Sequence, residues 1–185
     1  TDQNDMVTDD AGNVYVSGYV GDTSGYNETV IIKYNPSGVL QWTNLFDSTY
    51  YFNQINVDSH GNVFVTGTKY SNGSQIYLVK YDSSGTYEWD RLFNVGPYWN
   101  WGYDLVIDDS DDIIVGGITN ATLFTTLKYD TGGNLIFAAL DSATYGTSKT
   151  HLTFDENNNI YYTGRILDTT YKAIVFKYNS DGIKQ

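Results

Sequence analysis

Asp5, Asp104 and His151 carry the groups that acid–base chemistry uses, and they occupy equivalent positions of an internal repeat. A carboxylate and an imidazole are the usual general acid and base of hydrolases and lyases. The chain has no cysteine, which excludes a thiolate zinc site and a cysteine nucleophile. Its other histidine, His60, falls in a turn. Because no nucleophile adjoins His151 in sequence, an enzyme is the alternative hypothesis, and no catalytic residue and no cofactor are assigned.

Aromatic residues gather in three segments that follow one another at the same point of the repeat: DSTYYFNQ, NVGPYWNWGY and DSATYGTSKT. The candidate ligand-binding residues in these segments are Tyr50, Tyr98, Trp99, Trp101 and Tyr145. Flat rings beside Asn, Ser and Asp suit stacking on a sugar or anchoring a protein partner. The alternative is that the rings pack between neighbouring sheets, which is favoured for Tyr51 and Phe52. Trp99 and Trp101 lie in a segment with Gly and Pro and are the stronger candidates.

Two further patterns concern modification and metal binding. Asn27, Asn72 and Asn120 each begin an N-x-Ser/Thr acceptor and fall in equivalent loops, so they are candidate glycosylation sites in an exported protein. A dense acidic turn is the candidate site for Ca²⁺, with carboxylates from Asp108, Asp109, Asp111 and Asp112. Its spacing differs from the twelve-residue calcium loop. A solvated turn is therefore the favoured interpretation, and no metal is assigned.

Composition limits the partners of the chain. Hydrophobic residues make up 41% and charged residues 17%, which is typical of a folded β protein. A net charge of -12 would repel a phosphate backbone and an anionic membrane surface, so nucleic acid is excluded as a partner. No apolar stretch is long enough to span a bilayer, so no membrane insertion is expected.

The elements that must position these residues belong to a fourfold repeat. Its first motif is DDAGNVYVSG, DSHGNVFVTG, DDSDDIIVGG and DENNNIYYTG, and the closing glycines are Gly18, Gly67, Gly117 and Gly164. The second motif is IIKYNPSG, LVKYDSSG, TLKYDTGG and VFKYNSDG, with Lys33, Lys80, Lys128 and Lys177. An aromatic residue follows at Trp42, Trp89 and Phe137. Three markers that keep one period of about 48 residues indicate repeated structural units.

Each unit predicts four short antiparallel strands, a to d. Apolar residues alternate with polar ones and no segment has helical spacing. Asp-x-x-Gly-Asn between strands a and b, and Tyr-Asn/Asp-x-x-Gly between c and d, are typical of hairpin turns. Four such strands in about 48 residues predict an all-β fold, a β-propeller with four consecutive four-stranded blades. The repeated lysines are expected to be structural and to pair with an acidic turn residue of the same or the adjacent blade.

The motifs GNVYVSG, GNVFVTG, KYNPSGVLQW and KYDSSGTYEW resemble the bacterial β-propeller repeat family, the seven-bladed type found largely in secreted and cell-surface proteins. The resemblance covers nearly the whole chain. Asp111, Asp112, Phe137 and Asn158 depart from the motifs. The resemblance implies the fold and an extracellular or cell-surface location, and it implies no reaction.

We therefore expect one propeller segment over residues 1–185, with blades at 4–52, 53–101, 102–149 and 150–185, the last lacking its outer strand. These blades are expected to belong to a larger ring that other blades or other chains complete. A closed four-bladed monomer is the less favoured alternative, because it would leave an edge unpaired. The b-to-c and d-to-a connections share one face, where we expect a glycan or protein to bind. The leading hypothesis is a non-catalytic binding module or scaffold, and a hydrolase or lyase with its site at the channel mouth is the alternative.

Overall fold

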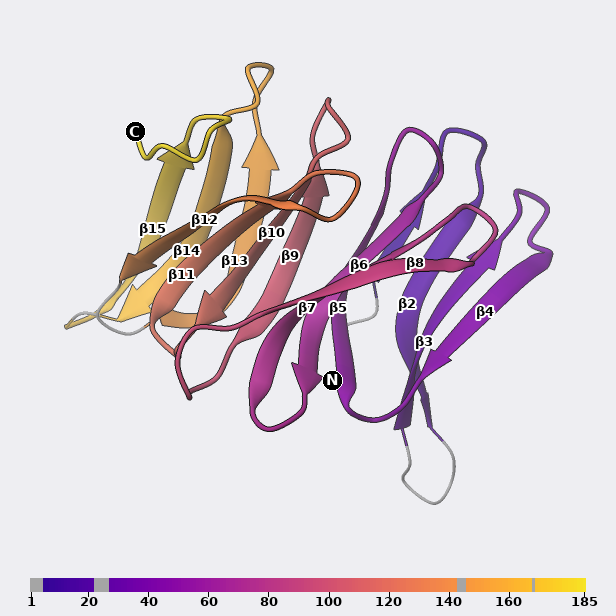
Figure 1. Cartoon of the computed structure of the whole chain (residues 1–185), viewed down its shortest axis with the longest axis horizontal. Coiled ribbons are helices and arrows are strands. Elements are labelled where there is room, and N and C mark those ends of the chain that lie inside the picture. The colour runs from indigo at the N-terminus through magenta and orange to yellow at the C-terminus, as the bar shows by residue number, and fades with distance from the viewer. Residues whose placement is uncertain (1–4, 22–26, 143–145, 168) are drawn as a thin grey trace.

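The structure, a computed structural model, describes residues 5–21, 27–142, 146–167 and 169–185. These residues form four antiparallel sheets and no helix (Figure 1). Sheet one contains β1 (Asp5–Thr8), β2 (Val14–Gly21), β3 (Asn27–Tyr34) and β4 (Leu40–Phe46); sheet two contains β5 (Tyr50–Val57), β6 (Val63–Tyr70), β7 (Ser74–Tyr81) and β8 (Tyr87–Phe93). Sheet three contains β9 (Trp101–Ile107), β10 (Ile113–Thr119), β11 (Leu123–Tyr129) and β12 (Leu135–Ser142); sheet four contains β13 (Gly146–Phe154), β14 (Ile160–Leu167) and β15 (Tyr171–Tyr178).

The strands of each sheet are hydrogen-bonded in chain order, and the sheets follow one another as blades. The first strands of successive sheets, β1, β5, β9 and β13, contact one another, so they lie on the inner side of the arrangement. Figure 1 shows the sheets side by side, from blade 1 in indigo and violet to blade 4 in orange and yellow. The predicted all-β propeller with four consecutive blades is confirmed.

Blade 2 begins earlier than the sequence indicated. Tyr50, Tyr51 and Phe52, which we assigned to a connection between blades, already belong to β5, because they pair with Lys69, Thr68 and Gly67 of β6. Trp101 likewise begins β9 and pairs with Ile118. The repeat boundaries at residues 53 and 102 therefore fall inside strands, because backbone pairing extends the inner strand beyond its alternating apolar residues.

Each pair of blades encloses its own apolar core. Between blades 1 and 2, Tyr15 and Ile31 pack against the facing side of blade 2. The buried residues on that side are Phe52, Ile55, Val63, Val65, Tyr77, Val79 and Tyr81. Separate cores lie between blades 2 and 3 and between blades 3 and 4. Blades 2 and 3 are covered on both sides, which accounts for the uninterrupted burial along most of β6 and all of β10.

The repeated motifs connect each blade to the next. Lys33 Nζ and Trp42 Nε1 of blade 1 both donate to Ser83 O in the c-to-d turn of blade 2, at 2.9 and 3.4 Å. Lys80 Nζ and Trp89 Nε1 of blade 2 donate to Thr131 O of blade 3, each at 3.3 Å. The expected acidic turn residues are found for Lys128, which pairs with Asp108 and Asp112 of its own blade. Lys80 pairs at 2.9 Å with Glu88, which belongs to strand β8 and not to a turn. Lys33 uses a backbone carbonyl instead.

Candidate functional site

A β-bulge in the inner strand of blades 2 and 3 places an extra residue of each strand at the surface of one cleft. The pairing shifts between Phe52 and Gln54 in β5 and between Gly102 and Asp104 in β9, so Asn53 and Tyr103 are the extra residues. The closing glycine of the repeat faces each bulge: a Cβ on Gly67 would lie 1.9 Å from Tyr51 O. Only glycine permits this close approach of two backbones.

Both bulge residues line a cleft of about 760 Å³ between blades 2, 3 and 4. The residues that line it come from the inner strands and from the end of β6: Tyr51, Asn53, Gln54, Thr68, Tyr70, Trp101, Tyr103, Asp104, Thr150 and His151. This is the end of the sheets that carries the d-to-a connections, where we expected a ligand to bind. The volume is in the range of small-molecule sites.

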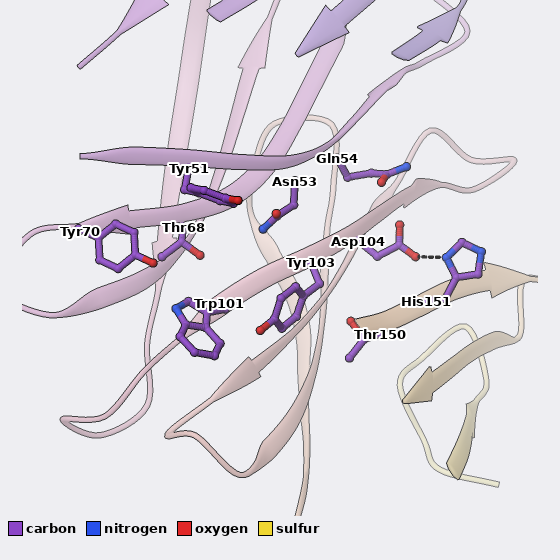
Figure 2. Close-up of a pocket in the computed structure, with 10 residues that line it drawn as sticks. All are labelled: Tyr51, Asn53, Gln54, Thr68, Tyr70, Trp101, Tyr103, Asp104, Thr150 and His151. Carbon is purple, nitrogen blue, oxygen red and sulfur yellow. Dashed lines mark ion pairs between the residues drawn. The ribbon is translucent and has the colours of Figure 1, made fainter. Parts of the chain in front are cut away.

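Aromatic rings form one side of the cleft. Figure 2 shows Tyr51, Tyr70, Trp101 and Tyr103 on this side. Trp101 also stacks on Trp99, with ring centres 5.3 Å apart and planes at 11°. Burial, with the nearby phenol of Tyr70, raises the pKa of Tyr103, so its hydroxyl stays protonated and able to donate a hydrogen bond. The aromatic side of the cleft therefore offers a flat apolar surface with hydroxyl groups at its edge.

Asp104 and His151 form the opposite, polar side (Figure 2). The Asp104 carboxylate is 3% exposed and lies 2.8 Å from His151 Nδ1. It also accepts the backbone N–H of Leu105 at 2.9 Å and that of Leu152 in blade 4. A carboxylate at Nδ1 orients the ring and leaves Nε2 to face a ligand. The His151 side chain is 77% exposed, so a ligand can reach it.

Of the three predicted acid–base residues, the structure brings Asp104 and His151 together and keeps Asp5 outside the cleft lining. Asp5 Oδ2 accepts the backbone N–H of Ile55 at 2.9 Å, which links blade 1 to blade 2. Asp104 makes the same kind of link between blades 3 and 4. The repeated aspartate therefore has a structural task at both positions.

Asn100 fixes the segment that carries Tyr98 and Trp99. Its side chain is 1% exposed and donates to Ser74 O at 2.9 Å and to Tyr98 O at 2.6 Å. Its Oδ1 accepts the backbone N–H groups of Val95 and Asn120, each at 3.1 Å. The side chain of Asn100 thus joins two other residues of the connection between blades 2 and 3, Val95 and Tyr98, to Ser74 and Asn120 outside it. These hydrogen bonds hold the stacked indoles in place.

The other predicted ligand-binding residues lie elsewhere. Tyr50 is half-buried and packs edge-on against Phe46 and Tyr77, with Lys69 Nζ 4.8 Å above its ring, so its surroundings are those of a packing residue. Tyr98 is 64% exposed and does not line the cleft. Tyr145 lies outside the described residues.

The three candidate glycosylation sites differ in their surroundings. Asn72 is exposed at the turn between β6 and β7, with φ 51°. Asn120 is half-buried, and its Oδ1 is fully buried beside Gly96. Asn27 begins β3, and its side chain lies outside what the structure describes.

The acidic turn of blade 3 is engaged within the protein. Asp108 Oδ2 and Asp112 Oδ2 lie 2.9 and 3.0 Å from Lys128 Nζ, and these carboxylates outweigh the effect of burial and raise the pKa of Lys128. Asp109 lines a small hollow between the a-to-b turns of blades 2 and 3. Among the described residues, no group of three or more His, Cys, Asp or Glu is arranged to hold a metal ion.

Ser59, His60 and Asp111 meet on the same face, as the members of a hydrolytic triad would. Ser59 Oγ lies 3.1 Å from His60 Nδ1, and Asp111 Oδ2 lies 3.3 Å from that same nitrogen. A triad needs the serine and the aspartate on different ring nitrogens. Ser59 Oγ also donates directly to Asp111 at 2.7 Å, so the group serves as a link between blades 2 and 3.

The candidate residues predicted from the sequence do not include Asn53, Gln54, Thr68, Tyr70, Tyr103, Thr150 or Asn100. The signal that points to Asn53 and Tyr103 is the closing glycine of the repeat, because it allows the bulge that turns them inward. For the others, the sequence contains no comparable signal.

No protein-family model and no curated protein matches the chain. Solved structures do match. The chain has a β-propeller fold. The PL25 ulvan lyase, solved bound to -[GlcA(1-4)Rha3S]-, aligns at 15% identity with a TM-score of 0.55, over 97% of this chain and 54% of that one. Xylan β-1,4-xylosidase from Bacillus halodurans C-125 aligns at 11% identity with a TM-score of 0.55, over 98% of this chain and 42% of that one.

A thermostable family-43 glycoside hydrolase aligns at 12% identity with a TM-score of 0.52, over 98% of this chain and 73% of that one. At such identities the likeness concerns the fold alone, and the chain spans about half the length of the lyase. In the described residues there is no helix with the length and apolar character needed to cross a membrane.

Proposed function

We propose that the cleft between blades 2, 3 and 4 binds a glycan and that the protein is a glycan-binding propeller outside the cell or at its surface. The observation that carries the proposal is the arrangement of the cleft, with aromatic rings on one side, Gln54 and His151 on the other, and Asn53 between them. A sugar ring presents an apolar face and a rim of hydroxyl groups, which match these two sides. The solved structures of similar fold include a polysaccharide lyase, a xylosidase and a glycoside hydrolase, which is consistent with this ligand class.

The test is replacement of Trp101 by alanine. Loss of the stacking surface is expected to weaken glycan binding by about tenfold to a hundredfold, measured by a glycan array followed by calorimetry on the best ligand. Tyr98→Ala is the matched control, because this residue lies on the connection just before Trp101, is exposed, and does not line the cleft. Equal binding by the Trp101→Ala variant and the wild type would remove the cleft from consideration as the glycan site.

A second candidate function, a lyase or hydrolase, is favoured by the contact between Asp104 and His151. The contact leaves Nε2 of an exposed imidazole available as a general base. Asp104 is the single carboxylate among the described residues that line the cleft. Glycoside hydrolysis by two carboxylates therefore has no counterpart there, and proton abstraction by His151 is the chemistry the described cleft supports.

His151→Gln tests this second function without disturbing the fold, because the side chain is exposed. If the protein is an enzyme of this kind, polysaccharide cleavage is expected to fall by about a hundredfold or more while ligand affinity changes little. Product release is followed by reducing-end and ultraviolet assays. Asp104→Asn is a poorer test, since Asp104 also bonds the backbone of blade 4. Full activity in the glutamine variant would exclude His151 as the base.

We also propose that a further complete blade covers the open side of blade 1. Met6 is 65% exposed there, although the residues at equivalent positions are almost fully buried: Ile55 1%, Leu105 1% and Leu152 2%. Among the described atoms, none lies within 4 Å of a Cβ on Gly38, whereas the equivalent glycines each face an aromatic ring of the preceding blade: Gly85 with Trp42, Gly133 with Trp89 and Gly182 with Phe137.

The single methionine of the chain reports on this surface. A copy of residues 5–49 carrying Met6→Ile, fused directly before Thr1, is expected to slow oxidation of the original Met6 by peroxide by about tenfold, as seen by mass spectrometry. The same fusion with Trp42→Ala in the copy is expected to protect less, because it lacks the ring that would cover Gly38. An unchanged oxidation rate in the first fusion would contradict the proposal. Protection that grows with the concentration of the unfused chain would assign the surface to a second copy instead.

A further inference from the structure

A second hollow adjoins the cleft on the outer side of the stacked tryptophans. It measures about 340 Å³ and is lined by Tyr70, Ser71, Asn72, Gly73, Ser74 and Trp99. Tyr70 lines both the hollow and the cleft. Trp101 lines the cleft, Trp99 lines the hollow, and the two indoles stack on each other. The stacked pair therefore stands between two adjacent spaces on one surface.

The ring of Trp99 is held in place although it is 62% exposed. The backbone carbonyl of Trp99 accepts the backbone N–H of Ala121 at 3.0 Å, and the buried Asn100 is the next residue in the chain. An exposed indole that is already fixed loses little conformational freedom when a ligand stacks on it. An exposed indole also leaves apolar surface in contact with water, which does not stabilise the fold. A role in ligand binding therefore explains the position of Trp99 better than a role in stability.

The charges around both spaces indicate the kind of sugar. Among the described residues that line them there is no lysine and no arginine, and the carboxylate and imidazole there, Asp104 and His151, are paired with each other. The chain as a whole carries a net charge of -12. An anionic sugar, a uronate or a sulfated unit, would meet this negative charge, and no lysine or arginine of the described lining would offset the repulsion. A neutral sugar needs only the hydroxyl and amide groups that are present.

We infer that the hollow at Trp99 is a second sugar subsite and that the ligand is a neutral oligosaccharide extending from the cleft across the stacked indoles. The inference rests on the proposed glycan-binding function and adds the class and minimum length of the ligand. One sugar unit lies against Trp101 in the cleft, and a neighbouring unit lies against Trp99, with Tyr70 between them. Asn72 and Ser71 at the turn of blade 2 bond to the outer unit.

Titration with neutral xylo- and cello-oligosaccharides of one to six units tests the inference. Affinity is expected to rise by about tenfold between one unit and three units. In the Trp99→Ala variant this gain with length is expected to disappear, and in the Trp101→Ala variant binding of every length is expected to weaken. Tyr98→Ala is the control for both, and oligogalacturonates of the same lengths serve as anionic probes.

Three results would overturn the inference. Length dependence that is unchanged in Trp99→Ala would remove the second subsite and leave glycan binding in the cleft intact. Tighter binding of oligogalacturonates than of neutral ligands would refute the neutral class, again without affecting the cleft. Absence of binding by all lengths and both classes would instead remove the proposed function on which the inference rests.

Discussion

Replacing Gly67 with alanine is expected to destabilise the propeller by about 3 kcal/mol, and so to lower its Tm by about 6–12 °C. The backbone conformation of Gly67 is one that alanine can adopt, so the effect arises from space and not from a positive φ. A Cβ at this position would lie 1.9 Å from Tyr51 O and 2.8 Å from Phe52 Cα. Both atoms belong to the backbone of β5, so the bulge itself must move.

Movement of that bulge also reaches the cleft. Asn53 is the extra residue of the bulge, and its Nδ2 donates to Gly102 O of blade 3. Gly67→Ala is therefore expected to weaken glycan binding as well as stability, and the two losses are measured by urea unfolding and by calorimetry on the folded variant. Each loss is expected because the alanine displaces strand β5, which belongs both to the core between blades 1 and 2 and to the cleft.

Gly132→Ala is the matched control for this prediction. Gly132 also has an ordinary φ, and the nearest atoms to its Cβ are the ends of the Asp130 and Asn134 side chains, at 3.3 and 3.4 Å. Those flexible ends can give way, so the control is expected to change stability by less than about 1 kcal/mol. Similar unfolding curves for the two variants would show that the close approach at Gly67 costs nothing and would refute the bulge argument.

Replacing Asn100 with alanine is expected to cost about 2–4 kcal/mol, most of it in the connection between blades 2 and 3. The side chain makes four hydrogen bonds in a buried position, to Ser74, Tyr98, Val95 and Asn120. Alanine leaves the backbone groups of all four residues without these partners. Hydrogen exchange of residues 94–100 is expected to speed up more than exchange in the strands, because the connection opens locally.

The same change is expected to reduce glycan affinity by about tenfold, since Trp99 and Trp101 flank Asn100 and lose their fixed arrangement. Asn100→Asp separates the two halves of the network, because it keeps the acceptor for Val95 and Asn120 and loses the donor to Ser74 and Tyr98. Asn94→Ala, an exposed asparagine of the same connection, is the control. Exchange rates that stay equal in Asn100→Ala and Asn94→Ala would mean that the network does not hold the connection.

The sequence by itself determined the blades and their order. The alternation of apolar and polar residues and the turn residues are local properties of the sequence. Because the same pattern occurs in all four repeats, the all-β propeller could be predicted without coordinates. Strand direction alone indicated the end of the sheets at which the cleft lies. Trp99 and Trp101 could be selected because two tryptophans in a segment with Gly and Pro have few structural uses.

Only the tertiary structure decided which residues make the cleft. Tyr70 ends the second strand of blade 2, Tyr103 is a bulge residue of blade 3, and His151 belongs to blade 4, so no local pattern relates them. The repeat aligned Asp104 with His151, and the structure showed that the carboxylate also bonds the backbone of blade 4. Contacts between residues about 50 positions apart depend on how the sheets pack and where a strand bulges, and these follow from the close approach of whole blades, which a single sequence does not encode locally.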